Sequence, residues 1–232
     1  MPIIRCDNLR YRYPQSDTLI FNDIHFQLQR PGFHALFGHS GVGKTTLARM
    51  IAGEITGYAG QFTFDGIERI FYTHNMERLP GWASVGDILK SITPTPCLEL
   101  LDRLIEIFGL QSCLQSRFGR LSLGQKNRIN LTRYLVQPFD MLILDESLAN
   151  VDETTRGGII SGIKSIFPQR CFIYISHNML EVSRCCDEIL LLRSPQKTPQ
   201  VISLNGLNES GTGTTMASKP LEEVLLEIAH AT

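Results

Sequence analysis

The stretch GHSGVGKTT at residues 38–46 decides the fold. It fits the pattern G-x-x-x-x-G-K-[ST], follows a short apolar segment at 33–37 and precedes a helix-like segment at 44–52. Glycines in such a turn let the backbone wrap around phosphate, and amide groups at the helix start face the anion. Lys44 supplies positive charge to the outer phosphates, and Thr45 supplies a hydroxyl to Mg²⁺. The predicted nucleotide-binding residues are Gly38, His39, Ser40, Gly41, Val42, Gly43, Lys44, Thr45 and Thr46.

A second chemical signal is MLILDE at 141–146. Its continuous apolar run is typical of a parallel strand that is buried on both faces. Because ligands bind at the carboxyl ends of strands in open α/β sheets, we expect Asp145 to lie beside the phosphate-binding turn. Asp145 is then predicted to hold Mg²⁺ through water. Glu146 is predicted to orient or polarise the attacking water.

The rest of the chain alternates strand-like and helix-like segments, which predicts an α/β fold with helices on both faces of a parallel or mixed sheet. An Asp65-Gly66 turn predicts a hairpin between its flanking strands. The expected strands span 3–13, 24–28, 33–37, 61–64, 69–72, 141–144 and 171–175, and the expected helices span 44–52, 98–108 and 122–135.

The C-terminal part of the chain has a different composition. Residues 194–219 are rich in Ser, Thr, Gly, Pro and Asn, which predicts a surface loop or flexible linker. A helix is expected at 220–230, with Leu221, Val224, Leu225 and Ile228 on one apolar face that docks on the body or on a partner. We interpret the whole chain, 1–232, as one domain.

Composition narrows the class of protein. The 232 residues are 43% hydrophobic, which is enough for a large core and excludes a disordered chain. The apolar runs are far shorter than the roughly 20 residues of a membrane-spanning helix, and the start does not resemble a secretory signal. A net charge of −1 offers no broad attraction to nucleic acid. The six cysteines show no metal-ligand spacing and are interpreted as reduced thiols.

A third segment, LSLGQ at 121–125, precedes MLILDE. In this order, the three segments resemble the ATP-binding cassette proteins, the ATPase subunits of ABC transporters, over nearly the whole chain to about residue 193. The resemblance implies a P-loop NTPase core with a mixed or parallel sheet, an N-terminal antiparallel β subdomain and an inserted α-helical subdomain at about 75–135. It also implies ATP and Mg²⁺ as ligands.

Further positions are assigned by the resemblance. Tyr13 matches the aromatic residue that stacks on adenine, although it could also be a tyrosine on an exposed strand face. His177 matches the histidine that contacts the γ-phosphate and supports Glu146, although a histidine after a strand is often structural. Together with Lys44, Glu146 and His177 form the predicted catalytic set. The signature residues Ser122, Gly124 and Gln125 would reach nucleotide held by a second protomer.

Three positions depart from the family pattern. Leu123 replaces a glycine, which is tolerable if its φ is negative. Ser147 replaces a proline after Glu146. His74, in HNMERLP at 74–80, stands where a glutamine normally reaches Mg²⁺ or the attacking water. A neutral imidazole could make a comparable contact with the metal, whereas imidazolium would repel it. Alternatively, His74 only lines the loop.

The resemblance implies a peripheral ATPase subunit on the cytoplasmic face of the inner or plasma membrane. Its expected partners are a second copy or a homologous ATPase subunit, transmembrane permease subunits and a solute-binding protein, with no nucleic acid. LPGW at 79–82 and RSP at 193–195 resemble the nitrate/sulfonate/taurine importer subgroup. Two alternatives stay open: a nucleotide-responsive scaffold with weak hydrolysis, suggested by Leu123 and His74, and a soluble non-transport ABC ATPase.

Overall fold

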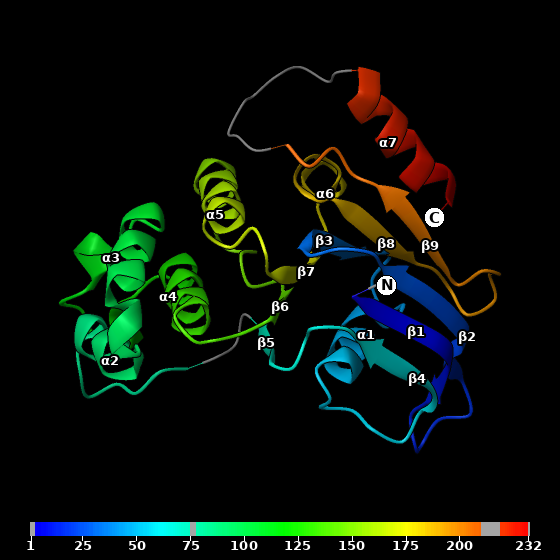
Figure 1. Ribbon diagram of the computed structural model, residues 1–232, viewed down its shortest axis with the longest axis horizontal. Helices are drawn as coiled ribbons and strands as arrows, with labels where there is room; N and C mark the ends of the chain where they lie inside the picture. The colour runs from blue at the N-terminus through cyan, green and yellow to red at the C-terminus, as the bar shows by residue number, and fades with distance from the viewer. Residues whose placement is uncertain (1–2, 75–77, 210–218, 232) are drawn as a thin grey trace.

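A six-stranded sheet built around the strand before the P-loop organises the fold (Figure 1). The computed structural model describes residues 3–74, 78–209 and 219–231. The strand order is β5-β6-β7-β3-β8-β9, with every neighbouring pair parallel except the antiparallel pair β8–β9. The strands are β3 (Gly32–Phe37), β5 (Ile70–His74), β6 (Met141–Asp145), β7 (Cys171–Ile175), β8 (Glu188–Leu192) and β9 (Val201–Asn205).

The inner strands of this sheet are buried on both faces, which explains why β6, β7 and β8 are almost entirely apolar. In β6, Leu142 and Leu144 join one hydrophobic cluster with helices α5 (Glu153–Ile166) and α6 (Met179–Cys185). The alternate residues Met141 and Ile143 join a second cluster, which contains helix α1 (Lys44–Ile51) and the N-terminal strands. The predicted α/β sandwich around a P-loop is therefore confirmed.

The N-terminal strands form a separate antiparallel sheet in the order β2-β1-β4. The predicted hairpin across Asp65-Gly66 is wrong, because β4 pairs with β1 whereas β5 pairs in parallel with β6. After the turn, the Asp140 carboxylate accepts hydrogen bonds from the amides of Glu68 and Arg69, at 3.1 and 2.9 Å, and directs the chain toward β6. These strands are β1 (Ile4–Arg12), β2 (Leu19–Leu28) and β4 (Ala59–Phe64).

Three helices within the predicted insertion lie together beyond the β5 edge of the central sheet (Figure 1). They contact one another, and α4 also contacts β5. Residues 75–77 of the predicted 75–135 insertion lie outside the described residues. The helices are α2 (Val85–Ile92), α3 (Leu98–Ile107) and α4 (Leu123–Leu135), with 3₁₀ turns η1 (Thr95–Cys97), η2 (Gln111–Cys113) and η3 (Phe118–Arg120).

The C-terminal segment is more ordered than its composition predicted. Residues 194–219 were expected to form a loop, but β9 lies within them and pairs with β8. This strand was missed because only five residues with mixed polarity form it, and pairing with an existing sheet edge stabilises so short a strand. Residues 210–218 lie outside the described residues.

The expected C-terminal helix is present as α7 (Lys219–Ala231). It packs against α6 and β9. Of the residues predicted for its apolar face, Leu221, Val224 and Ile228 are buried, and Leu225 is half-buried. The helix therefore docks on the body of the chain. All six cysteines are free thiols, as expected. None of the helices in the described part of the chain is both long and apolar enough to cross a bilayer.

Candidate nucleotide-binding and catalytic site

The turn between β3 and α1 leaves the start of the helix open to an anion. Gly43 is the N-cap of α1 at φ 105°, and no side chain caps the helix there. A Cβ at Gly43 would lie 2.8 Å from the Ile20 side chain and 2.9 Å from the ring of Phe21, so only glycine fits. The first amides of α1 therefore have no side-chain acceptor, which is the arrangement that binds phosphate.

Lys44 lies folded back on this turn. The residue is 7% exposed, and its Nζ donates to the carbonyl oxygens of Gly38 and His39, each at 2.9 Å. Burial lowers the pKa of the Lys44 ammonium, while the nearby carboxylates of Asp145 and Glu146 act in the opposite direction. A phosphate bound at the turn would offer this cation a stronger, charged acceptor than two carbonyls.

A cavity of about 300 Å³ brings most of the predicted site together. The predicted loop residues Gly38, His39 and Val42 are not among the residues that line it. The carboxylates come from the end of β6, and the histidine comes from the loop after the neighbouring strand β7. The predicted site residues that line the cavity are Tyr13, Ser40, Gly41, Gly43, Lys44, Thr45, Thr46, Asp145, Glu146 and His177.

Glu146 and His177 are in direct contact. Glu146 Oε1 lies 2.6 Å from His177 Nε2, and the Glu146 amide donates to the Ile175 carbonyl at 3.2 Å. Glu146 adopts φ 52°, a left-handed conformation that is uncommon for a residue with a side chain. Such strain persists only where surrounding contacts impose it, and it is typical of functional sites. Because Oε1 of Glu146 contacts His177, Oε2 is the carboxylate oxygen that can accept a proton from a water molecule.

A buried network that the sequence analysis missed supports the His177 loop. Glu181 accepts hydrogen bonds from Ser176 Oγ at 2.8 Å and from Tyr174 Oη at 3.0 Å, and it pairs with Arg156. Arg156 also donates to the Val151 carbonyl at 3.5 Å. The network thus joins the loop after β7 to the loop after Glu146. Its only sequence signal was the placement of both charges in the first turn of a helix.

Ser147, the residue that directly follows Glu146, also links the loop after Glu146 to a neighbouring strand. The Ser147 hydroxyl, which stands where the family has a proline, is buried and donates to the Thr73 carbonyl at 3.1 Å. It ties the loop after Glu146 to strand β5.

The residues around Asp145 fit a Mg²⁺ site. Thr45 Oγ1 donates to Asp145 Oδ2 at 2.7 Å, and Asp145 is 7% exposed. Within the described part of the chain, no three His, Cys, Asp or Glu side chains gather into a metal cluster. Mg²⁺ at nucleotide sites needs only one or two protein oxygens, because water and phosphates supply the rest. The hydroxyl of Thr45 and the carboxylate of Asp145 are the side chains that would hold it.

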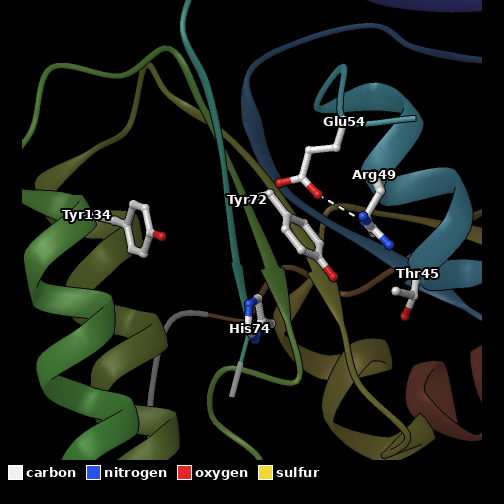
Figure 2. A pocket seen from close by; sticks show the side chains of 6 residues that line it. All are labelled: Thr45, Arg49, Glu54, Tyr72, His74 and Tyr134. Atoms are coloured by element: carbon white, nitrogen blue, oxygen red, sulfur yellow. Dashed lines mark hydrogen bonds and ion pairs between the residues drawn. The ribbon is translucent and has the colours of Figure 1, made fainter. Parts of the chain in front are cut away.

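His74 lies in an adjoining cavity. It is the exposed last residue of β5 and is paired in register with Asp145. A cavity of about 400 Å³ is lined by His74, Thr45, Arg49, Glu54, Tyr72 and Tyr134, as Figure 2 shows. The two cavities share Thr45. His74 therefore lies near the metal side of the site, but not in the nucleotide cavity itself, and its role as a metal ligand stays a prediction.

The signature residues lie outside the nucleotide cavity. Ser122 is the N-cap of α4 and forms a capping box with Gln125: Ser122 Oγ accepts from the Gln125 amide at 3.3 Å, and Gln125 Oε1 accepts from the Ser122 amide at 2.9 Å. Leu123 begins the helix, is not among the residues with positive φ, and is 49% exposed. The condition for tolerating a side chain at position 123 is therefore met.

Gly124 lies so close to the Asn150 backbone of the same chain that a larger residue does not fit there. A Cβ at this position would lie 2.3 Å from the Asn150 carbonyl oxygen, a distance that real Cβ atoms do not reach. We expect Gly124→Ala to separate α4 from the loop after Glu146 and to lower the free energy of unfolding by about 1–3 kcal/mol. Gly158→Ala is the matched control, because a Cβ there meets nothing within 4 Å and alanine favours the helix α5. Equal urea-unfolding midpoints for the two variants would contradict this packing.

The strand–turn–helix motif, with Asp145 and Glu146 at the carboxyl edge of a parallel sheet, defines a P-loop NTPase. The family model described as "ABC transporter" matches residues 21–149, which is more than half of the chain. The chain therefore belongs to the ABC transporter ATP-binding family, the ABC ATPases.

Named relatives agree with this assignment. The chain is 31% identical over 202 residues to the molybdenum import ATP-binding protein ModC of Saccharophagus degradans, covering 79% of this chain and 55% of that protein. It is 34% identical over 187 residues to ModC of Brucella abortus, covering 72% of this chain and 52% of that protein. An ABC transporter ATP-binding protein of Haemophilus influenzae is 29% identical over 195 residues, covering 79% of this chain and 80% of that protein. The chain thus spans about half the length of the ModC relatives.

Solved structures share the fold. A bacterial Atm1-family ABC exporter with ATP bound superposes with a TM-score of 0.75 at 20% identity, covering 89% of this chain and 39% of that chain. An inward-facing putative metal-chelate type ABC transporter gives a TM-score of 0.69 at 19% identity, covering 88% of this chain and 84% of that chain.

Proposed function

We propose that this chain binds and hydrolyses ATP to power a membrane ABC transporter. The observation that carries the proposal is the 2.6 Å contact between Glu146 and His177 in the same cavity as Lys44 and Asp145. A scaffold that only binds nucleotide has no need for a carboxylate held against an imidazole. The intact pair therefore favours hydrolysis over the nucleotide-responsive scaffold.

Each side chain of the cavity has a part in this reaction. Lys44 leaves the loop carbonyls for the outer phosphates, and the amides of α1 bind the same anion. Glu146 accepts a proton from the attacking water, and His177 orients both Glu146 and the γ-phosphate. Mg²⁺, when bound by Thr45 and Asp145, stabilises negative charge on the phosphate oxygens.

Tyr13 is the proposed adenine-stacking residue. Its hydroxyl shares a 2.7 Å hydrogen bond with Thr46 Oγ1, which anchors the ring at the edge of the cavity. Its ring also contacts Tyr11 edge to face, with centroids 5.3 Å apart. An aromatic ring fixed at this edge offers a stacking surface for a base.

We further propose that two chains complete each other's sites. Ser122, Gly124 and Gln125 lie outside the cavity that holds the P-loop and Glu146 of the same chain. The N-terminus of α4 is suited to a phosphate, so the signature segment would act on nucleotide held by a second copy or a homologous ATPase subunit. ATP would close this dimer, and hydrolysis would reopen it.

The permease is proposed to dock on the helical side near α2. A largely apolar cavity of about 390 Å³ is lined there by Leu79, Trp82, Ile88 and Ile92, among others, and Trp82 is 79% exposed. An exposed apolar patch of this kind marks an interaction site. It supports attachment to transmembrane subunits at the cytoplasmic face of the membrane over the soluble, non-transport alternative.

The transporter is proposed to import a small solute with the help of a solute-binding protein. The support is that the ModC relatives are named as molybdenum import proteins. The likeness of 79–82 and 193–195 to the nitrate/sulfonate/taurine subgroup stays a prediction.

The test is phosphate release by the purified chain, alone and with a candidate permease in lipid vesicles. We expect Mg²⁺-dependent hydrolysis of ATP that increases when the permease is added. Nucleotide binding without turnover in either condition would favour the scaffold. Turnover that no permease changes would favour a soluble ATPase.

A further inference from the structure

The Asp145 carboxylate has a second hydroxyl donor that no motif of the sequence predicted. Tyr72 Oη donates to Asp145 Oδ2 at 2.7 Å. Thr45 Oγ1 donates to the same oxygen, also at 2.7 Å. Rotation of this carboxylate would break two hydrogen bonds in a mostly buried place, where an unsatisfied charged group is costly.

The position of Tyr72 follows from strand geometry. Tyr72 precedes His74 by two residues in β5, so both side chains lie on the same side of the sheet. The two ring centroids are 6.0 Å apart. Figure 2 shows the ring reaching from β5 toward Thr45, beside the ion pair between Arg49 and Glu54. Neighbours from strand and helix thus hold the hydroxyl on the side of Asp145.

We infer that Tyr72 is a positioning residue for the Mg²⁺ site, because its hydroxyl holds the Asp145 carboxylate in the orientation that receives the metal. This inference rests on the proposed function. Thr45 is itself expected at the metal, whereas Tyr72 approaches Asp145 from the adjoining cavity and need not move when metal binds. The Tyr72 hydrogen bond therefore orients the carboxylate both before and after metal binding.

The direction of the hydrogen bond suits this role. An ionised carboxylate only accepts hydrogen bonds, so the Tyr72 hydroxyl is the donor of the pair. Outer partners that orient metal-binding side chains typically change metal affinity by about 10–100-fold when they are removed.

The test compares Tyr72→Phe with wild type in two measurements. The first is the affinity for a fluorescent ATP analogue in EDTA. The second is the dissociation constant of Mn²⁺ from nucleotide-loaded protein, followed by the electron paramagnetic resonance signal of free Mn²⁺. We expect the affinity in EDTA to stay within about twofold, and the Mn²⁺ dissociation constant to rise about tenfold. Tyr134→Phe is the matched control, because it removes another tyrosine hydroxyl from the lining of the same cavity.

A double-mutant cycle with Asp145→Asn makes the test independent of small effects on folding. If Tyr72 acts through Asp145, adding Tyr72→Phe to Asp145→Asn changes Mn²⁺ affinity much less than it does in wild type. Two results would overturn the role of Tyr72 and leave the proposed function standing. One is an equal Mn²⁺ affinity for wild type and Tyr72→Phe, and the other is the same loss of Mn²⁺ affinity in the wild-type and Asp145→Asn backgrounds. Wild-type protein that binds no nucleotide would instead overturn the proposed function.

Discussion

Replacing Glu146 with glutamine is expected to lower ATP turnover by about 10²-fold or more while leaving ATP binding intact. Glutamine keeps the size and the polar contact with His177 but cannot accept a proton from water. Because the phosphate-binding turn is unchanged, the variant should collect as an ATP-bound dimer. Phosphate release measures the first effect, and sedimentation with and without Mg-ATP measures the second.

Glu153→Gln is the matched control for this prediction. Glu153 is an exposed acid in the first turn of α5 and does not line the nucleotide cavity, so the substitution removes one carboxylate charge outside the site. We expect turnover close to wild type for this control. Near-normal turnover in Glu146→Gln would show that Glu146 is not the base.

Mixing two inactive variants is expected to restore turnover if the site is shared between chains. Lys44→Ala removes the phosphate-binding cation, and Ser122→Asp places a negative charge where the second chain's phosphate would bind. Aspartate caps a helix as well as serine does, so α4 keeps its N-cap and the substitution tests the role in trans. A hybrid dimer then contains one doubly altered site and one intact site.

Three measurements accompany the mixing experiment. Thermal unfolding of each variant should show that α4 is intact, and each variant alone should be nearly inactive. The mixture should hydrolyse ATP faster than the two proteins measured separately. Wild-type protein should also be diluted until it is monomeric. If its turnover per chain then stays constant, a shared site would be contradicted.

Local features of the sequence were sufficient for the phosphate-binding turn. The left-handed Gly43, the helix start at Lys44 and the preceding strand lie within a few positions of one another, although Ile20 and Phe21 also exclude a Cβ at Gly43. The same holds for the Ser122 capping box and for Asp145 at the end of an apolar strand. Backbone geometry over such short distances depends little on the rest of the chain, so pattern and spacing predict it well.

Tertiary structure alone decided the contacts between distant segments. The Asp65-Gly66 turn reverses the chain, but whether its flanking strands pair with each other depends on which sheet edges β1 and β6 offer. Likewise, the close approach of Gly124 to Asn150 arises only when α4 packs on the loop after Glu146.

Tyr72 shows the same limit at the site itself. The alternation of side chains along a strand predicts the face of β5 on which Tyr72 lies. It does not predict which residue of another strand Tyr72 contacts. The hydrogen bond to Asp145 joins residues 73 positions apart and exists because β5 and β6 are adjacent in the sheet. Sequence by itself predicted the groups that we propose for the phosphate chemistry, because those groups lie in short local motifs. The folded structure decided which other groups hold them in place, because hydrogen bonds between strands depend on topology.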